Sequence, residues 1–182
     1  MGEGLVALIV LIVFVASAAL FARRRSTPSN QYERGLPAEL RGAEIAYAEK
    51  TFRSHSRRLV ATVDRAYRTR VGLQLVELKT RSRDVVYMSD VIELSVQRIA
   101  LEDETGEAVS EGAWVLVQNS RSGKRRPRKV HLMAISEITA MRNHYADLVQ
   151  GRVDSPAPAR SPSQCDQCAH KARCATKYMD RA

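Results

Sequence analysis

The sequence predicts one α/β domain, because alternating strand-length segments and amphipathic helical segments follow one another along the chain. A chain of 182 residues is enough for one domain with a core of its own and hardly for two. The first three strands are closely spaced, which favours an antiparallel meander. The expected strands are 44–52, 59–67, 73–80, 113–119 and 129–135, and the expected helices are 89–104 and 136–151.

The N-terminal segment predicts a membrane anchor. An apolar run extends from Leu5 to Ala22 with only Ser17 as a polar interruption. As a helix it would span about 27 Å, close to the thickness of the hydrocarbon core of a bilayer. The arginines at 23–25 follow the run, so the positive-inside rule predicts a single-pass protein of the cell membrane with its domain in the cytoplasm. A cleavable signal peptide would carry its positive charge before the run, although the "ASAA" patch leaves processing open.

The chain divides into four parts by composition. Residues 1–25 form the anchor with its basic flank, and residues 26–36 are a polar, turn-rich tether. Residues 37–151 form the domain, and residues 152–182 hold a Pro/Ser linker and a tail with all three cysteines. A short helix is expected within 31–41, although Gly35 and Pro37 weaken it. The expected caps are Ser89 or Asp90 for the first long helix and Ser136 for the last, with Gly151 past its end.

The charge balance favours a polyanionic partner. The formal net charge is +9, which suits nucleic acid or an anionic membrane surface. The stretch "RSGKRRPRK" at 121–129 holds six cations and is expected to be mostly a solvated hairpin loop between the last two strands. On a nucleic-acid-binding domain it would instead grip the phosphate backbone, and near a membrane it could touch anionic lipids. The candidate contacts are Arg81, Arg83, Lys124, Arg125, Arg126, Arg128 and Lys129.

Two carboxylates and a lysine interrupt apolar strand faces. In an extended chain Glu77 and Lys79 lie on one face with Leu73 and Leu75, and Asp64 interrupts a face of the preceding strand. If these strands pair through the turn near 68–72, Asp64 falls roughly opposite 76–77. Two carboxylates with a nearby lysine suit a hard divalent cation such as Mg²⁺, although a solvated ion pair on an edge strand is the simpler interpretation of the five residues 76–80 alone.

These residues resemble a known family. Asp64, then Glu77-Leu78-Lys79 after twelve residues, and Gln97 on the following helix are similar to the motif of the PD-(D/E)xK nuclease superfamily. The tail "CDQCAHKARC" is similar to its CRISPR-associated exonuclease and RecB-type branch. The resemblance implies a restriction-endonuclease-like αβββαβ core and a Mg²⁺- or Mn²⁺-dependent nuclease that acts on DNA.

The resemblance also implies roles for the residues. Asp64 and Glu77 would bind the metal, Lys79 would assist the attacking water, and Gln97 would match the glutamine of a Q-x3-Y motif. Leu101 stands where that motif has its tyrosine. A further acidic residue or histidine normally completes the metal site. Its candidates are Glu39, Glu44, Glu49 and His55, with Glu49 preferred.

The cysteine tail predicts a metal site, but the sequence does not decide which metal it binds or which residue is the fourth ligand. Cys165, Cys168 and Cys174 are three thiols, whereas a [4Fe–4S] cluster generally takes four. His170 would complete a zinc site, and His144 or His55 could serve instead. A partial cluster with an external ligand, an empty degenerate site, and three cysteines that merely pack together are the other possibilities.

Three functions remain in competition at this point. The first is the membrane-anchored nuclease, and the second is a degenerate nuclease fold that binds DNA or a partner at the membrane without cleaving. The third is a small membrane-associated metal or redox protein built on the cysteine tail.

Overall fold

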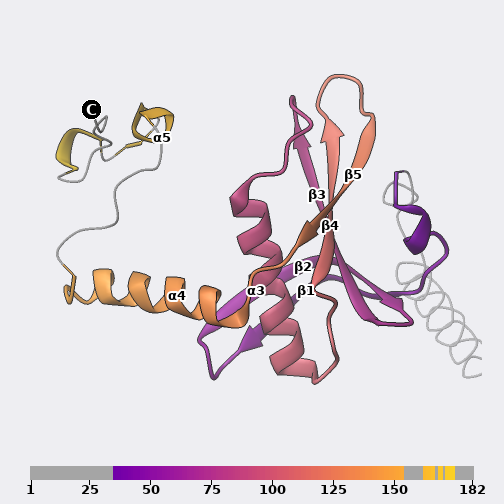
Figure 1. Ribbon diagram of the computed structural model, residues 1–182, viewed down its shortest axis with the longest axis horizontal. Coiled ribbons are helices and arrows are strands. Elements are labelled where there is room, and N and C mark those ends of the chain that lie inside the picture. The colour runs from indigo at the N-terminus through magenta and orange to yellow at the C-terminus, as the bar shows by residue number, and fades with distance from the viewer. Residues whose placement is uncertain (1–34, 154–161, 167, 170, 175–182) are drawn as a thin grey trace, which may run out of the picture.

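The computed structural model describes residues 35–153, 162–166, 168–169 and 171–174 (Figure 1). Within these residues no helix is both long and apolar enough to cross a membrane, and the predicted anchor at 5–22 lies outside them. The helical elements are η1 (Ala38–Leu40), α3 (Met88–Thr105), α4 (Ile135–Val149), α5 (Pro162–Asp166) and η2 (Lys171–Arg173). The strands are β1 (Ile45–Ser54), β2 (Leu59–Thr69), β3 (Gly72–Arg81), β4 (Gly112–Asn119) and β5 (Arg125–His131).

The five strands form one mixed sheet in the order β1-β2-β3-β4-β5. The pairs β1–β2, β2–β3 and β4–β5 are antiparallel, and β3–β4 is parallel. A parallel pair needs a crossover connection, and α3 supplies it between β3 and β4. The predicted meander of the first three strands and the predicted long helix are therefore confirmed.

Helix α3 covers one face of the sheet, and the short η1 segment covers part of the other (Figure 1). Leu73 and Leu75 of β3 pack in a core cluster with Leu94 and Leu101 of α3. On the opposite face, Val76 packs in a second cluster with further apolar residues, which include Leu36, Leu40 and Leu116. Strand β3 is thus covered on both faces, and residues 73–77 are all buried, including the polar Gln74 and Glu77.

The helix starts differ from the predicted caps. Helix α3 begins after Tyr87, whose backbone N–H donates to the carboxylate of Asp90 at 2.9 Å, so Asp90 stabilises the first turn and Ser89 does not. Helix α4 begins after Ala134, whose backbone N–H donates to Glu137 at 2.8 Å. The prediction of Ser136 as its cap was wrong, because an acidic side chain at the third helical position satisfies the same orphan donor from within the helix.

The position of the last strand was also predicted wrongly. Strand β5 runs over Arg125–His131, so most of the expected basic loop is in fact an edge strand, and only residues 120–124 form the turn. An edge strand tolerates Pro127 and a row of charges, because one side of it needs no ladder partner. Of the segment 31–41, where a short helix was expected, the structure describes residues 35–41, and these contain the three-residue η1.

The tight turn between β2 and β3 generates a stability prediction. Gly72 has φ +108°, and a Cβ atom there would lie 2.6 Å from the carbonyl oxygen of Ala108. That oxygen is held in place by the backbone N–H of Leu73 at 2.9 Å. We therefore expect Gly72→Ala to lower the free energy of unfolding by more than about 2 kcal/mol, measured by urea denaturation.

Gly106 provides the matched control for this prediction. It ends α3 with φ +71°, but a Cβ there would meet nothing within 4 Å. Gly106→Ala should cost about 1 kcal/mol, from backbone strain alone. Equal losses in the two variants would show that the clash with Ala108 does not matter.

Candidate active site

The predicted acidic residues lie where strands β2 and β3 separate. The β2–β3 ladder ends with Arg65 opposite Val76, so Asp64 and Glu77 occupy the next position in that register. Beyond it, β2 continues beside β1 and β3 continues beside β4. The carboxylate of Asp64 accepts a hydrogen bond from the backbone N–H of Leu78 at 3.1 Å. The strand register thus places Asp64 next to residues 76–77, as the sequence predicted.

Glu77 is a buried carboxylate held by two donors. Only 4% of the residue is exposed. Its Oε2 accepts from Nε2 of Gln97 at 2.8 Å, and its Oε1 lies 2.8 Å from Nζ of Lys79. Burial raises the pKa of Glu77 to about 7, against the opposing effect of these two hydrogen bonds, and the charge of Asp64 adds to the rise. The site therefore holds a carboxylate that titrates near neutral pH when no cation is present.

Lys79 lies between two carboxylates. Its ammonium group is 2.8 Å from Glu77 and 2.7 Å from Glu93, a residue of α3. Burial acts to lower the pKa of Lys79, but the hydrogen bonds and charges of the two carboxylates raise it above its ordinary value. Lys79 is consequently protonated at neutral pH and serves as a fixed positive charge.

Gln97 brings an amide into the interior beside Glu77. The residue is 1% exposed, and its Oε1 has no hydrogen-bond partner among the residues that the structure describes. A buried acceptor without a partner is costly, typically about 1–3 kcal/mol. An ordered water or a ligand donor at this position would remove that cost.

Glu49, the preferred third ligand, turns its carboxylate to another partner. On β1, Ala48 pairs with Arg65 and Lys50 pairs with Val63. Glu49 therefore lies opposite Asp64 in the register. Its backbone has φ 49°, its side chain is 62% exposed, and its Oε1 accepts from the guanidinium of Arg65 at 2.9 Å. Across the described part of the chain, no three His, Cys, Asp or Glu side chains are grouped so that they could hold a metal ion. Asp64 and Glu77 are the two predicted metal ligands that the structure brings together at this point of the sheet.

The predicted nucleic-acid contacts fall into three groups. Arg81 makes two 2.9 Å hydrogen bonds to Asp90 and lies over the ring of Tyr87, so it holds the start of α3. Arg83 is exposed in the loop before α3. The remaining cations lie on the β4–β5 hairpin and are divided between the two faces of the sheet, because side chains alternate along a strand.

The hairpin cations on the site's own face are Arg126 and Arg128. Val117 pairs with both Lys79 and Arg126, and Val115 pairs with both Glu77 and Arg128. Paired residues share a face, so these two arginines lie on the face that carries Glu77 and Lys79. On the other face, Arg125 donates to Gln118 at 2.7 Å and Lys129 lies 5.5 Å from the centre of the Trp114 ring. Lys124 is exposed where the turn meets β5.

The described residues of the cysteine segment form a turn, and no three potential ligands among them are grouped to hold a metal ion. The backbone N–H of Cys168 donates to the carbonyl of Cys165 at 3.1 Å, which closes the C-x2-C turn. None of the three cysteines forms a disulfide. His170, the predicted fourth ligand, lies outside the described residues. A metal at these cysteines stays a prediction.

Sequence reasoning missed two residues of this face. Glu93 precedes Gln97 by four residues, so the helical period alone could have placed both toward β3. Asp84 binds Arg126 and Arg128 across the face, and nothing in the sequence links a loop carboxylate to a strand more than forty residues away.

Comparison with known proteins identifies the family. Residues 15–175 match the model of the PD-(D/E)XK nuclease superfamily. The chain belongs to this superfamily. Its mixed five-stranded sheet fits the restriction-endonuclease-like core, and members of the PD-(D/E)XK superfamily are generally metal-dependent nucleases, although some are degenerate.

The other comparisons add little to the superfamily assignment. A solved structure titled "Crystal structure of SSO0001" is similar with a TM-score of 0.47 and 11% sequence identity, over 92% of this chain and 72% of that one. No curated protein matches the sequence. The CRISPR-associated and RecB-type branch therefore stays a prediction.

The raised pKa of Glu77 generates a prediction about stability and pH. Between the ordinary pKa of 4.5 and about 7, the folded protein keeps a proton that the unfolded chain has released, so this group makes stability fall as pH rises through that window. Glu77→Gln removes the titration. Without divalent cations, we expect the variant to be more stable than the parent by about 3–4 kcal/mol at pH 8.5, because the pKa of Glu77 differs by about 2.5 between the two states and one pKa unit corresponds to about 1.4 kcal/mol.

The difference should vanish at about pH 3.5, one unit below the ordinary pKa, where Glu77 is largely protonated in both states. Urea unfolding at the two pH values, with EDTA present, measures it. A stability difference that is independent of pH would mean that ionisation of Glu77 does not destabilise the fold. That result would contradict the claim that burial raises its pKa.

Proposed function

We propose that this chain is a nuclease that hydrolyses phosphodiester bonds of DNA with the help of Mg²⁺ or Mn²⁺. The observation that carries the proposal is the group formed by Asp64, Glu77 and Lys79 at the point where β2 and β3 separate. Membership of a superfamily of nucleases supports the reaction class. The basic balance of the chain and the cationic hairpin support a polyanionic substrate.

The donor set fits a hard divalent cation. Asp64 and Glu77 supply carboxylate oxygens, which Mg²⁺ and Mn²⁺ prefer, and Mg²⁺ commonly binds through one or two carboxylates plus waters and substrate phosphates. The negative charge of Asp64 contributes to the raised pKa of Glu77, and a cation held by both residues would relieve that repulsion. When bound, the metal would supply positive charge that activates water and stabilises the phosphate oxygens.

The remaining polar residues have separable roles in this proposal. Lys79 is protonated, so it donates hydrogen bonds and stabilises the negative charge that develops on the phosphate, rather than accepting a proton. Gln97 holds one oxygen of Glu77 and offers Oε1 as an acceptor. Glu93 positions Lys79 from the side of α3 and keeps its ammonium charged.

A binding module without catalysis is the second candidate. Leu101 is completely buried in the core and takes the place of the tyrosine of the superfamily's Q-x3-Y motif. Both oxygens of Glu77 are also engaged by side chains of the same chain. Such a protein would retain DNA or a partner through the cationic hairpin and would not cleave.

A metal centre at the C-terminal cysteines is a separate proposal. A zinc ion or an iron–sulfur cluster at Cys165, Cys168 and Cys174 would stabilise the C-terminal segment, with His170 as a possible further ligand. If the third candidate, a metal or redox protein, were correct, substitution of these cysteines would abolish function and substitution of Asp64 would have no effect.

A cleavage assay distinguishes these functions. We expect the parent chain to cut labelled DNA with Mg²⁺ or Mn²⁺. Glu77→Gln and Lys79→Met should each reduce the rate at least 100-fold, because each removes a charge at the reacting phosphate. Single- and double-stranded substrates are compared, and circular dichroism confirms that the variants are folded.

Arg98→Met is the matched control for Lys79→Met. Arg98 is a cation whose side chain is 15% exposed, compared with 23% for Lys79, and it also pairs with a carboxylate, Glu102. Its removal should leave the rate within about twofold of the parent. Binding without any cleavage by the parent would favour the binding module, and full activity in both site variants would refute the assigned active site.

We further propose that residues 5–22 anchor the protein in the cell membrane with the domain in the cytoplasm. The support is the length and apolarity of this run and the arginines that follow it. Upon cell fractionation, the full chain should sediment with membranes and resist extraction by high salt. A chain beginning at residue 26 should be released, and its persistence in the membrane fraction would contradict the proposal.

A further inference from the structure

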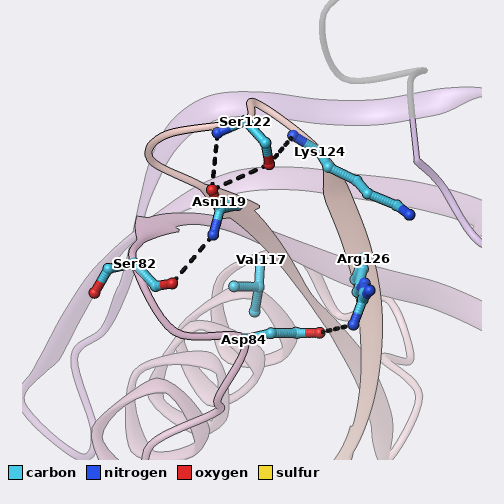
Figure 2. A pocket seen from close by; sticks show the side chains of 7 residues that line it. All are labelled: Ser82, Asp84, Val117, Asn119, Ser122, Lys124 and Arg126. Carbon is cyan, nitrogen blue, oxygen red and sulfur yellow. Dashed lines mark hydrogen bonds and ion pairs between the residues drawn. The ribbon is translucent and has the colours of Figure 1, made fainter.

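A cavity of about 220 Å³, lined mostly by polar residues, lies where β3 and β4 end and β5 begins (Figure 2). It is lined by residues of the loop after β3, of β4, and of the hairpin that leads into β5. Figure 2 shows Val117 at its floor, with Arg126 and Lys124 to one side and Ser82 to the other. By the volume that water occupies in the liquid, this is room for about seven molecules, so the occupant is a small group rather than a large ligand.

The cavity opens on the face of the sheet that carries the candidate active site. Lys79, Val117 and Arg126 pair in one row across β3, β4 and β5. Neighbouring strands are about 4.8 Å apart, so the backbone at Arg126 lies about 10 Å from that at Lys79. A chain molecule with a repeating charged group can therefore reach both places at once.

The cavity carries excess positive charge. Lys124, Arg126 and Arg128 are three cations around one carboxylate, Asp84, which leaves a local charge of +2. Hydrogen bonding from Arg128, and less from Arg126, lowers the pKa of Asp84 to about 2, so it stays ionised at neutral pH. An anion that enters the cavity would thus be attracted by the net positive charge, which Asp84 reduces but does not cancel.

Donor groups remain available for such an anion. Arg126 uses one nitrogen, its NH1, to bind Asp84 at 3.0 Å, and its side chain is 56% exposed. Within the residues described, no hydrogen bond engages its other guanidinium nitrogens or the ammonium of Lys124. Asp84 therefore fixes the position of the Arg126 guanidinium while leaving it donors that fit phosphate oxygens.

The wall of the cavity is held in place by the turn. The side chain of Asn119 accepts from the backbone N–H groups of Arg121 and Ser122, at 3.0 and 2.8 Å, and donates to the carbonyl of Ser82 at 3.1 Å. It thus ties the β4–β5 turn to the loop after β3, as the dashed lines in Figure 2 show. A site built in this way needs little reorganisation to receive a ligand.

We propose that this cavity binds one backbone phosphate of a nucleic-acid strand, while a second phosphate of the same strand, one or two nucleotides away, occupies the site at Glu77 and Lys79. The inference rests on the proposed nuclease function and adds to it a direction for the strand, across β4 toward β5. A strand is favoured over a membrane lipid because the cavity shares its face of the sheet with the acidic site.

The first test measures salt dependence of binding. The full chain with Asp64→Asn, in mild detergent with Mg²⁺, is titrated with a labelled single-stranded oligonucleotide at several salt concentrations. Loss of one phosphate contact should reduce the slope of log K against log salt by about 0.7. We expect this reduction upon Arg126→Gln.

Arg152→Gln provides the matched control. Arg152 also pairs with an aspartate, Asp147, and its side chain is likewise 56% exposed, but it lies just beyond α4. The two variants therefore remove the same charge from equally exposed positions. Arg152→Gln should leave the slope unchanged, and an equal change in both variants would overturn the proposal in favour of a general charge effect.

The second test locates the phosphate. Each backbone phosphate of the oligonucleotide is replaced in turn by a neutral methylphosphonate. One replacement should weaken binding by about tenfold in the Asp64→Asn protein and have no further effect when Arg126→Gln is also present, because a hydrogen bond to a charged group is typically of this size. Additive losses at every position would overturn the proposal.

Competition separates the possible sources of phosphate. Inorganic phosphate at up to 10-fold the oligonucleotide concentration should not displace the strand, since it makes one of several contacts. Displacement by it, or by vesicles that contain anionic lipid but not by neutral vesicles, would overturn the assignment to a strand. Cleavage by the parent is measured separately. If the parent does not cleave, but one methylphosphonate still loses its effect when Arg126→Gln is present, the nuclease function is refuted and the phosphate site is supported.

Discussion

The buried carboxylate of Glu77 is the constraint on which the rest of the domain depends. A charge that is taken out of water must be compensated by nearby donors, or it becomes neutral. Here the compensation comes from Gln97 on α3 and from Lys79 two residues along the same strand. Helix α3 must therefore lie so that Gln97 reaches β3, and the paired Arg81 and Asp90 fix its first turn at the end of that strand. The position of the crossover helix and the geometry of the candidate active site therefore depend on each other. The two donors offset only part of the cost of burying the charge of Glu77, so a cation bound nearby would stabilise that charge.

The parallel pairing of β3 and β4 extends this construction across the sheet. Because paired residues share a face, the row that contains Lys79 continues through Val117 to Arg126, and the row that contains Glu77 continues through Val115 to Arg128. The valines are buried and separate the acidic site from the basic hairpin without placing a charge between them. Lys79 and its carboxylate partners therefore lie on one side of the buried valines, and Arg126 and Arg128 lie on the other.

Much of the fold and the centre of the site could be predicted from the sequence because both depend on local period. The alternation in 59–67 and 73–80 placed Asp64 roughly opposite 76–77, which the register confirms. Gln97 was found through the resemblance to the superfamily motif, and its side chain does reach Glu77. Strand β5 was misplaced because six cations in nine residues are typical of a loop, whereas an edge strand also tolerates them. Asp84 could not be found, since its partners are set by tertiary contact rather than by spacing. Glu49 was preferred as a position in the first strand that could face inward, but its backbone has a positive φ and its carboxylate binds Arg65.

Edge protection alone could explain cations on β5, because charged side chains on an edge strand oppose pairing with another sheet. That function needs only exposed charge and no fixed geometry. Asp84 does more than this: it binds two guanidinium groups together on the face that carries Lys79. Exposed ion pairs contribute little stability and restrict long side chains, so stability gives little reason to order these arginines. Ordered donors do lower the cost of binding an anion, because their rotamer entropy has been lost before the ligand arrives. The arrangement of the arginines around Asp84 is thus better explained by recognition than by edge protection.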